Sequence, residues 1–169
     1  KTSLLNLLSI LGFRIVAEVA NVLIDLEISR GNSMENWRIS EEEFSRRILA
    51  WKVRIESFFD PNEVLFFDRA IPDGLGYDLG VEEVLVAYAY KYNKVFWLEP
   101  VGFRPSYTRK KDEVQKQLVI GEKIKQAYIQ LGCDVVVVPP CENNIERAQI
   151  ILREAGLECP NLAFSLSEL

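Results

Sequence analysis

Four short runs rich in apolar residues, separated by stretches with helical periodicity, constrain the fold of this chain most strongly. These runs cover residues 13–18, 64–67, 94–100 and 134–140. Apolar runs of this length are typical of strands buried within a sheet. Strands that alternate with helices predict a parallel sheet with helices on both faces, which is an α/β fold of three layers.

The stretches between these runs show the spacing and end signals of helices. The expected helices cover residues 2–11, 18–29, 40–59, 81–92, 112–131 and 143–156. Ser40 is expected to begin one of them, because Glu43 three residues later completes a capping box, and Gly132 is expected to end another. Residues 68–80 contain a proline and several glycines, so we expect turns there.

The size and composition of the chain argue against several classes of protein. Its 169 residues fit one domain, which we expect to cover 1–156, with 157–169 as a tail. The net charge of −5 argues against a nonspecific binder of nucleic acid or anionic membranes, and no apolar run reaches the ~20 residues that span a bilayer. We therefore expect a cytoplasmic protein without a nucleic-acid or membrane partner. The chain has no histidine, which excludes His-based zinc sites and Ser-His or Cys-His catalysis.

Charged residues follow the expected strands at the edge where an open parallel sheet binds its ligands. Glu18 ends the first strand, and Glu99 ends the third. Asp68 and Arg69 follow the second strand directly after "VLFF". Surface charges are common at strand ends, so solvation is the preferred explanation for Glu18 or Glu99 alone. The Asp68–Arg69 pair is the more specific indication of a functional site.

The chain starts with Lys1 and Thr2 directly before a helical pattern. In a phosphate-binding loop, Lys reaches the β- and γ-phosphates, Ser or Thr ligates Mg²⁺, and the following helix faces the anion. Thr is also a routine N-cap, so these two residues alone indicate little. We expect the glycines of such a loop, and the strand before them, to precede Lys1.

A basic segment at 101–111 carries Arg104, Arg109, Lys110 and Lys111 in an otherwise acidic protein. Such a segment can close over a transferring phosphoryl group and neutralise its charge, and Arg109 is the first candidate for this role. A solvated loop explains the same residues, and the two lysines are expected at the surface.

Two further segments have alternative explanations. Residues 71–74 have the pattern of a turn, although Asp73 within them could contact an acceptor substrate. Pro140 could line a pocket for a nucleotide base, or it could simply end the preceding strand. The aromatic residues within 88–92 are expected to pack inside a helix.

The segments "KTSLLNLLSILGFRIVAEVANVLID", "VLFFDRAIPDGLGY" and "LGCDVVVVPP" resemble the kinase-like P-loop NTPases with an AAA-type ATPase domain. The resemblance covers nearly the whole chain in the same order, and "FFDRAIPD" is its most specific part. It implies a P-loop fold similar in layout to nucleoside and nucleotide kinases. It also implies binding of ATP or GTP with Mg²⁺, and then NTP hydrolysis or phosphoryl transfer to a small-molecule acceptor. A nucleotide-dependent regulatory module with little catalysis is the alternative.

The resemblance implies roles for residues around the phosphates. Lys1 would contact the β- and γ-phosphates, and Thr2 would hold Mg²⁺. Asp68 would hold the metal or act as a base toward an acceptor hydroxyl. Arg69 would touch phosphate or acceptor, and Arg109 would be the cation of a lid.

The resemblance implies further roles on the substrate side. Glu18 matches a family acid that faces the acceptor, and Asp73 would contact the acceptor as well. Arg104 and Pro140 would contribute to nucleotide binding. The chain departs from the family pattern at Asn21, where an arginine is usual, so an acceptor contact from that helix is in doubt.

Overall fold

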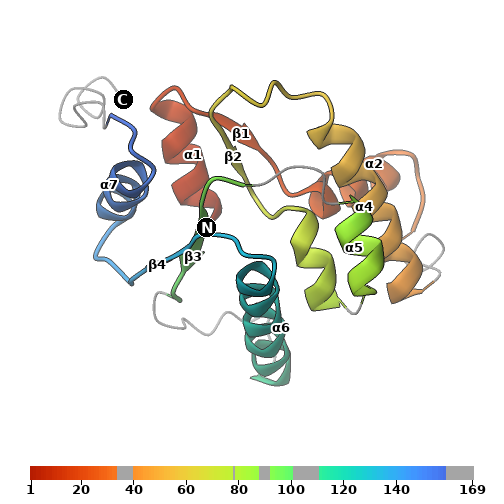
Figure 1. Cartoon of the computed structure of the whole chain (residues 1–169). Coiled ribbons are helices and arrows are strands. Elements are labelled where there is room, and N and C mark those ends of the chain that lie inside the picture. Colours follow the sequence, from red (N-terminus) through yellow and green to blue (C-terminus); the bar gives the residue numbers. More distant parts are fainter. Residues whose placement is uncertain (34–39, 78, 88–91, 101–110, 159–169) are drawn as a thin grey trace.

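The computed structural model describes residues 1–33, 40–77, 79–87, 92–100 and 111–158 (Figure 1). The helices are α1 (Thr2–Ile10), α2 (Val19–Ser29), α4 (Glu41–Glu56), α5 (Val81–Ala87), α6 (Lys111–Gln130), α7 (Asn144–Glu154) and the 3₁₀ helix η1 (Ile71–Tyr77). The strands are β1 (Arg14–Val16), β2 (Leu65–Phe67), β3 (Val95–Leu98) and β4 (Val135–Val138). Helices and strands therefore alternate as the sequence predicts.

The largest difference from the sequence prediction concerns residues 68–80, which were expected to form turns. They contain η1 instead, and Pro72 fits its first turn because the N–H that proline lacks has no partner within the helix there. The helix expected at 81–92 is observed as α5 up to Ala87, and residues 88–91 lie outside the described ranges.

The helix starts follow the local rules of capping. The Oγ atom of Ser40 accepts a hydrogen bond from the N–H of Glu43 at 3.1 Å, as the sequence predicts. Asn143 caps α7 in the same way, because its Oδ1 atom accepts from the N–H of Glu146 at 2.9 Å. Within the described ranges, no helix is both long enough and apolar enough to cross a membrane.

The four strands form two parallel pairs. In the first pair, Arg14 of β1 lies opposite Leu65 of β2, and in the second pair Val95 of β3 lies opposite Val135 of β4. Helices connect the strands within each pair, as parallel strands require. In the part of the chain that the structure describes, β2 and β3 form no ladder with each other, so each keeps one edge without a strand partner.

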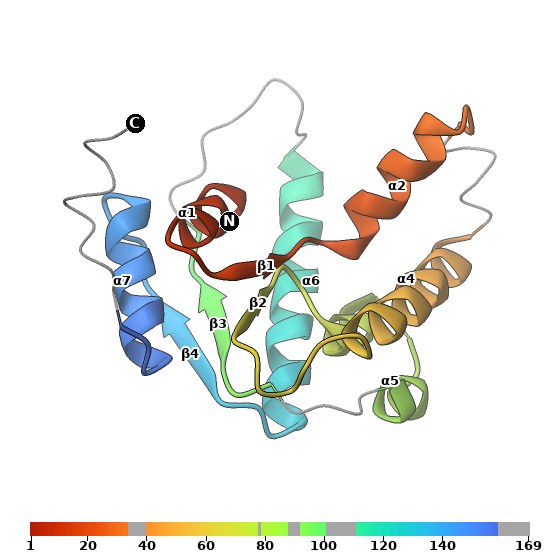
Figure 2. The same ribbon diagram turned by 90° about the horizontal axis from the view of Figure 1, so that it is seen from above.

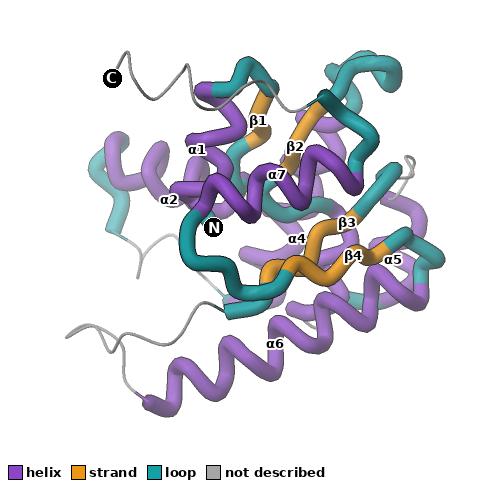
Figure 3. The backbone as a smooth tube through the Cα atoms, turned by 90° about the vertical axis from the view of Figure 1, so that its left-hand side faces the viewer, coloured by secondary structure: helices purple, strands orange, loops and turns teal. Residues whose placement is uncertain are grey.

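Both strand pairs lie between the same two layers of helices. Phe66 and Phe96 pack on one side with the buried cluster of α1 and α7. Phe67 and Trp97, the next residues along their strands, pack on the other side with Ile124 of α6. This alternation puts both pairs in one layer, and Figure 3 shows β3 and β4 between α7 and α6. The expected three-layer α/β architecture is therefore confirmed.

The remaining helices gather beside the first strand pair. Figure 2 shows α2, α4 and α5 on one side of the strands and α7 on the other. Leu49 of α4, Ile71 of η1 and Val84 of α5 belong to one buried cluster. Because η1 also contacts α6, it lies at the junction of three helices.

Gly76 of η1 lies where a side chain would collide with α6. A Cβ atom at this position would overlap Cγ1 of Ile124 and lie 3.4 Å from the backbone oxygen of Ile120. We expect Gly76→Ala to lower the free energy of unfolding by about 1–3 kcal/mol, because overpacking displaces the neighbouring helix. Urea unfolding measures this change.

Gly80→Ala is the matched control, because a Cβ atom there meets no atom of the described residues within 4 Å. We expect its unfolding midpoint to stay close to that of the wild type. Equal midpoints for Gly76→Ala and Gly80→Ala would contradict the observed packing of η1 on α6.

Candidate functional site

Four of the expected site residues meet where β1 and β2 end. The Nζ atom of Lys1 lies 2.5 Å from Oδ1 of Asp68 and 4.0 Å from Oε2 of Glu18. The Nε atom of Arg69 lies 2.8 Å from Oε1 of Glu18. Residues distant in sequence thus form one cluster of alternating charges, which we call the Lys1–Asp68 cluster: Lys1, Glu18, Asp68 and Arg69.

The backbone conformation explains why the adjacent residues Asp68 and Arg69 contact different partners in this cluster. The N–H of Asp68 donates to the carbonyl of Val16 at 2.8 Å, which continues the β1–β2 ladder by one residue. Arg69 has a φ of 70°, in the left-handed region that non-glycine residues rarely adopt. The chain therefore turns sharply after Asp68, and the two side chains contact different groups.

Asp73 of η1 lies against this cluster and is only 2% exposed. Its Oδ1 atom accepts a hydrogen bond from the hydroxyl of Tyr128 at 2.9 Å. Its Oδ2 atom lies 3.7 Å from Nη1 of Arg69 and 3.9 Å from Nζ of Lys52, and it has no hydrogen-bond partner among the described residues. The carboxylate that was expected to contact an acceptor therefore contacts residues of the protein itself in this structure.

Sequence reasoning missed Lys52 and Glu56 of α4, which are 6% and 7% exposed. The Nζ atom of Lys52 donates to the carbonyl of Ala70 at 2.6 Å. The hydroxyl of Tyr92 donates to Oε2 of Glu56 at 2.7 Å and accepts from the N–H of Ile71 at 3.2 Å. Lys52 therefore contacts the segment that follows Arg69 directly, whereas Glu56 reaches it only through the hydroxyl of Tyr92.

Burial and neighbouring charges shift the pKa values of these groups. Burial lowers the pKa of Lys52 from its ordinary value, although Asp73 opposes this change. Burial raises the pKa of Glu56, and together with Asp73 it raises the pKa of Tyr128 well above its ordinary value. Burial acts against the charge of Arg69, but Asp73 and the neighbouring anionic groups outweigh it and raise its pKa. Arg69 is therefore cationic at neutral pH.

The other expected site residues are placed as follows. Thr2 is the first residue of α1 and follows Lys1, which occupies the N-cap position. Pro140 is exposed after the end of β4. Arg104 and Arg109 lie outside the described residues.

A buried arginine that sequence reasoning also missed holds the ends of the second strand pair. Arg147 of α7 is 5% exposed, and its Nη2 atom donates to the carbonyl of Glu99 at 2.6 Å. Its Nε atom donates to the carbonyl of Pro139 at 3.2 Å. The carboxyl ends of β3 and β4 are thereby tied to each other and to α7.

The donor set of the Lys1–Asp68 cluster fits Mg²⁺ only in combination with a further ligand. Asp68 Oδ1 is buried and receives no well-aligned hydrogen bond from the described part of the chain, although the ammonium group of Lys1 lies beside it. Among the described residues, no group of three or more Asp, Glu, Cys or His could hold a metal alone. Mg²⁺ typically binds one or two carboxylates together with water and substrate phosphates, which fits Asp68 and the hydroxyl of Thr2.

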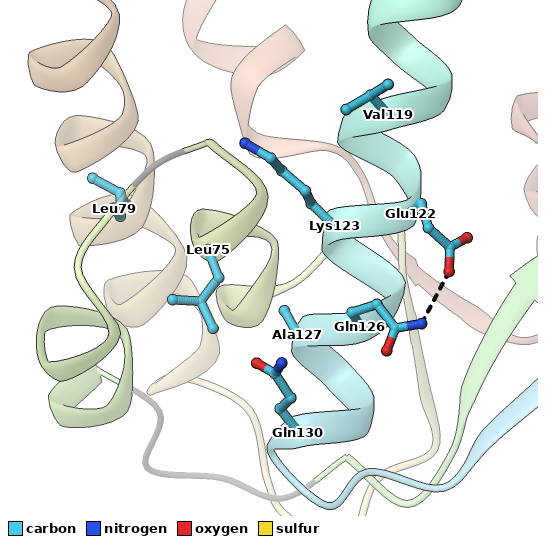
Figure 4. Close-up of a pocket in the computed structure, with 8 residues that line it drawn as sticks. All are labelled: Leu75, Leu79, Val119, Glu122, Lys123, Gln126, Ala127 and Gln130. Carbon is cyan, nitrogen blue, oxygen red and sulfur yellow. Dashed lines mark hydrogen bonds between the residues drawn. The ribbon is translucent and has the colours of Figure 1, made fainter.

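A separate groove of about 740 Å³ opens between η1 and α6 (Figure 4). Leu75 and Val119 line it together with polar side chains, and Gln126 donates a hydrogen bond to Glu122 at 2.9 Å beside it. None of its lining residues belongs to the Lys1–Asp68 cluster. The groove is therefore not part of the candidate site.

Comparison with known proteins gives one family match. The model of a family described as "AAA domain" matches residues 1–147, which include the whole Lys1–Asp68 cluster. No curated protein and no solved structure matches the chain.

Glu56 is expected to make the stability of the protein depend on pH. Its pKa is raised above the ordinary 4.5, so the folded state holds this proton more tightly than the unfolded state does. The stability that this proton contributes is present below pH 4.5 and is lost as the pH rises through the higher pKa of the folded state.

We expect the wild type to lose stability relative to Glu56→Gln when the pH is raised from about 4 to about 7. Glutamine keeps an acceptor for the Tyr92 hydroxyl but does not titrate. Urea unfolding of both proteins at the two pH values measures the difference. A difference that is independent of pH, or that moves in favour of the wild type, would contradict the raised pKa.

Proposed function

The chain belongs to the AAA domain family, a family of nucleotide-binding P-loop proteins, and from this premise we propose a reaction for the Lys1–Asp68 cluster. The protein binds ATP or GTP with Mg²⁺ there and hydrolyses the nucleotide or transfers its γ-phosphoryl group to a small-molecule acceptor. The contact of 2.5 Å between Lys1 and Asp68 carries the proposal, because it joins the start of α1 to the acid that follows β2.

Lys1 and Asp68 neutralise each other in this structure. When phosphates bind, the ammonium group of Lys1 turns to the β- and γ-phosphate oxygens, and the carboxylate of Asp68 becomes available to a cation. Asp68 and the hydroxyl of Thr2 would hold Mg²⁺, which when bound neutralises negative charge on the phosphates. Alternatively, Asp68 orients the attacking water or acceptor hydroxyl and accepts its proton.

Arg69 and Glu18 supply the acceptor side of the site. The side chain of Arg69 is 32% exposed, and its Nε atom lies 2.8 Å from Glu18 without a well-aligned hydrogen bond among the described residues, so the guanidinium can donate hydrogen bonds outward. A fixed guanidinium stabilises negative charge that develops on a phosphoryl oxygen. Glu18, whose side chain is 20% exposed, can accept a hydrogen bond from an acceptor hydroxyl.

The proposal also requires backbone N–H donors around the phosphates, which Lys1 and Thr2 do not supply by themselves. Arg109 remains the candidate for the lid cation, and Arg104 and Pro140 remain candidates for nucleotide contacts.

Lys1→Ala is expected to weaken nucleotide binding at least tenfold, because a hydrogen bond to a charged group contributes about 1.5–3 kcal/mol. Titration with fluorescent ATP and GTP analogues measures the dissociation constants. Lys94→Ala is the matched control, because Lys94 pairs with Asp134 at the opposite ends of the strands. Wild-type affinity of Lys1→Ala for both nucleotides would remove Lys1 from the binding site.

Asp68→Asn is expected to keep nucleotide binding but to slow turnover by roughly 10²-fold or more, because the amide neither accepts a proton nor carries charge. Phosphate release, measured with and without candidate acceptors, follows turnover. Asp134→Asn removes an exposed carboxylate of the same type and serves as control. Turnover of Asp68→Asn at the wild-type rate would exclude Asp68 from the reaction.

A further inference from the structure

Lys52 is a buried cation whose position needs an explanation. It lies on the face of α4 that also carries buried Leu49 and partly buried Val53, where an apolar side chain would meet no desolvation penalty. A buried lysine is tolerated when its ammonium group is paired and hydrogen-bonded. The partners of Lys52 therefore indicate what it does.

The first partner of Lys52 is the backbone directly after Arg69. Its Nζ atom lies 2.6 Å from the carbonyl oxygen of Ala70, and the N–H of Asp73 donates to the same oxygen at 3.2 Å. Ala70 follows the left-handed backbone of Arg69, a strained conformation that persists only where neighbouring contacts impose it. The ammonium group of Lys52 is one of those contacts.

The second partner of Lys52 is the carboxylate of Asp73, which Arg69 also approaches. The Oδ2 atom of Asp73 lies 3.9 Å from Lys52 and 3.7 Å from Arg69, beyond hydrogen-bond distance of both. Arg69 meanwhile keeps its shorter contact of 2.8 Å with Glu18. Because Lys52 and Arg69 both compensate the charge of Asp73, this charge does not draw Arg69 away from Glu18.

We infer that Lys52 is a positioning residue for Arg69: it holds the Ala70 carbonyl and shares the charge of Asp73, so that Arg69 stays at Glu18. Without Lys52, Arg69 is the one cation among the described residues within 4.0 Å of the buried carboxylate of Asp73. Its guanidinium then moves from Glu18 toward Asp73 and leaves the edge of the sheet. Arg69 contacts reacting groups only if the proposed function holds. The expected effect of Lys52 on turnover therefore rests on the proposed function, whereas the expected position of Arg69 does not.

The position of Arg69 can be measured without any nucleotide. The side-chain Nε–H of Arg69 gives a ¹⁵N–¹H resonance, which is assigned as the one that Arg69→Lys removes. We expect this resonance to shift in Lys52→Met, because its contact with Glu18 is lost. In the double variant Lys52→Met/Asp73→Asn, we expect it to return toward its wild-type position, because the neutral amide no longer attracts Arg69.

Glu56→Gln is the matched control for removing a buried charge. Glu56 lies one turn after Lys52 on the same face of α4, but its hydrogen-bond partner is Tyr92. We expect the Arg69 resonance to remain at its wild-type position in this variant. An equal shift in Glu56→Gln and Lys52→Met would mean that loosening of α4 moves Arg69, and this would overturn the inference.

Turnover connects this position to the proposed function. If Arg69 serves the reaction, we expect Lys52→Met to lower kcat roughly 10²-fold at nearly unchanged nucleotide affinity, since displacing a catalytic group by about 1 Å has effects of this size. The double variant is expected to recover most of the loss. A protein without turnover would refute the proposed function, whereas the resonance would still decide the role of Lys52.

The role of Lys52 can still be tested if the Lys52→Met variant does not fold. Leaving a buried charge without its partner is strongly destabilising, and removing both charges is much less so. Lys52→Gln, which retains a donor for Ala70, then replaces Lys52→Met in the same measurements. An Arg69 resonance that is unchanged in the single variant without Lys52 would overturn the inference, whatever the turnover.

Discussion

The burial of Asp73 between Arg69, Lys52 and Tyr128 is the interaction on which the rest of the structure depends. A carboxylate so far from water requires cations or donors around it, because the loss of hydration is costly. Its partners come from the turn after β2, from α4 and from α6. Three separate parts of the chain must therefore assemble around η1 before this charge is compensated, and their assembly directs Arg69 toward Glu18.

Much of the fold could be predicted because its signals are local. The run "VLFF" at 64–67 is apolar on both faces, and the observed strand buries Phe66 and Phe67 against opposite layers. The cap at Ser40 depends on residues within one turn. The 3₁₀ helix at 71–77 could not be predicted, because the same residues suit a turn and only packing against α4, α5 and α6 decides between them.

The candidate site could be predicted only where the strand order brings residues together. Asp68 follows a buried strand, so its position at the sheet edge follows from topology. Charges at positions 52 and 56 in an otherwise apolar helical stripe are visible in the sequence, but nothing local identifies their partners. Lys52 binds a carbonyl 18 residues away, and Asp73 bonds to a tyrosine 55 residues away. Contacts of such separation are set by tertiary packing and leave no periodic pattern.

The two strand pairs share one layer although no ladder joins β2 to β3 in the described ranges, so side-chain packing must align them. Leu4 and Leu8 of α1 supply this packing, since they share a buried cluster with Leu152 of α7 and with side chains of both pairs. Arg147 of the same α7 holds the carbonyl of Glu99 at the end of β3. Because α7 supports both α1 and the ends of β3 and β4, it fixes where Lys1 lies relative to the second strand pair. The distance between Lys1 and the second strand pair is therefore set by α7, which contributes no residue to the Lys1–Asp68 cluster.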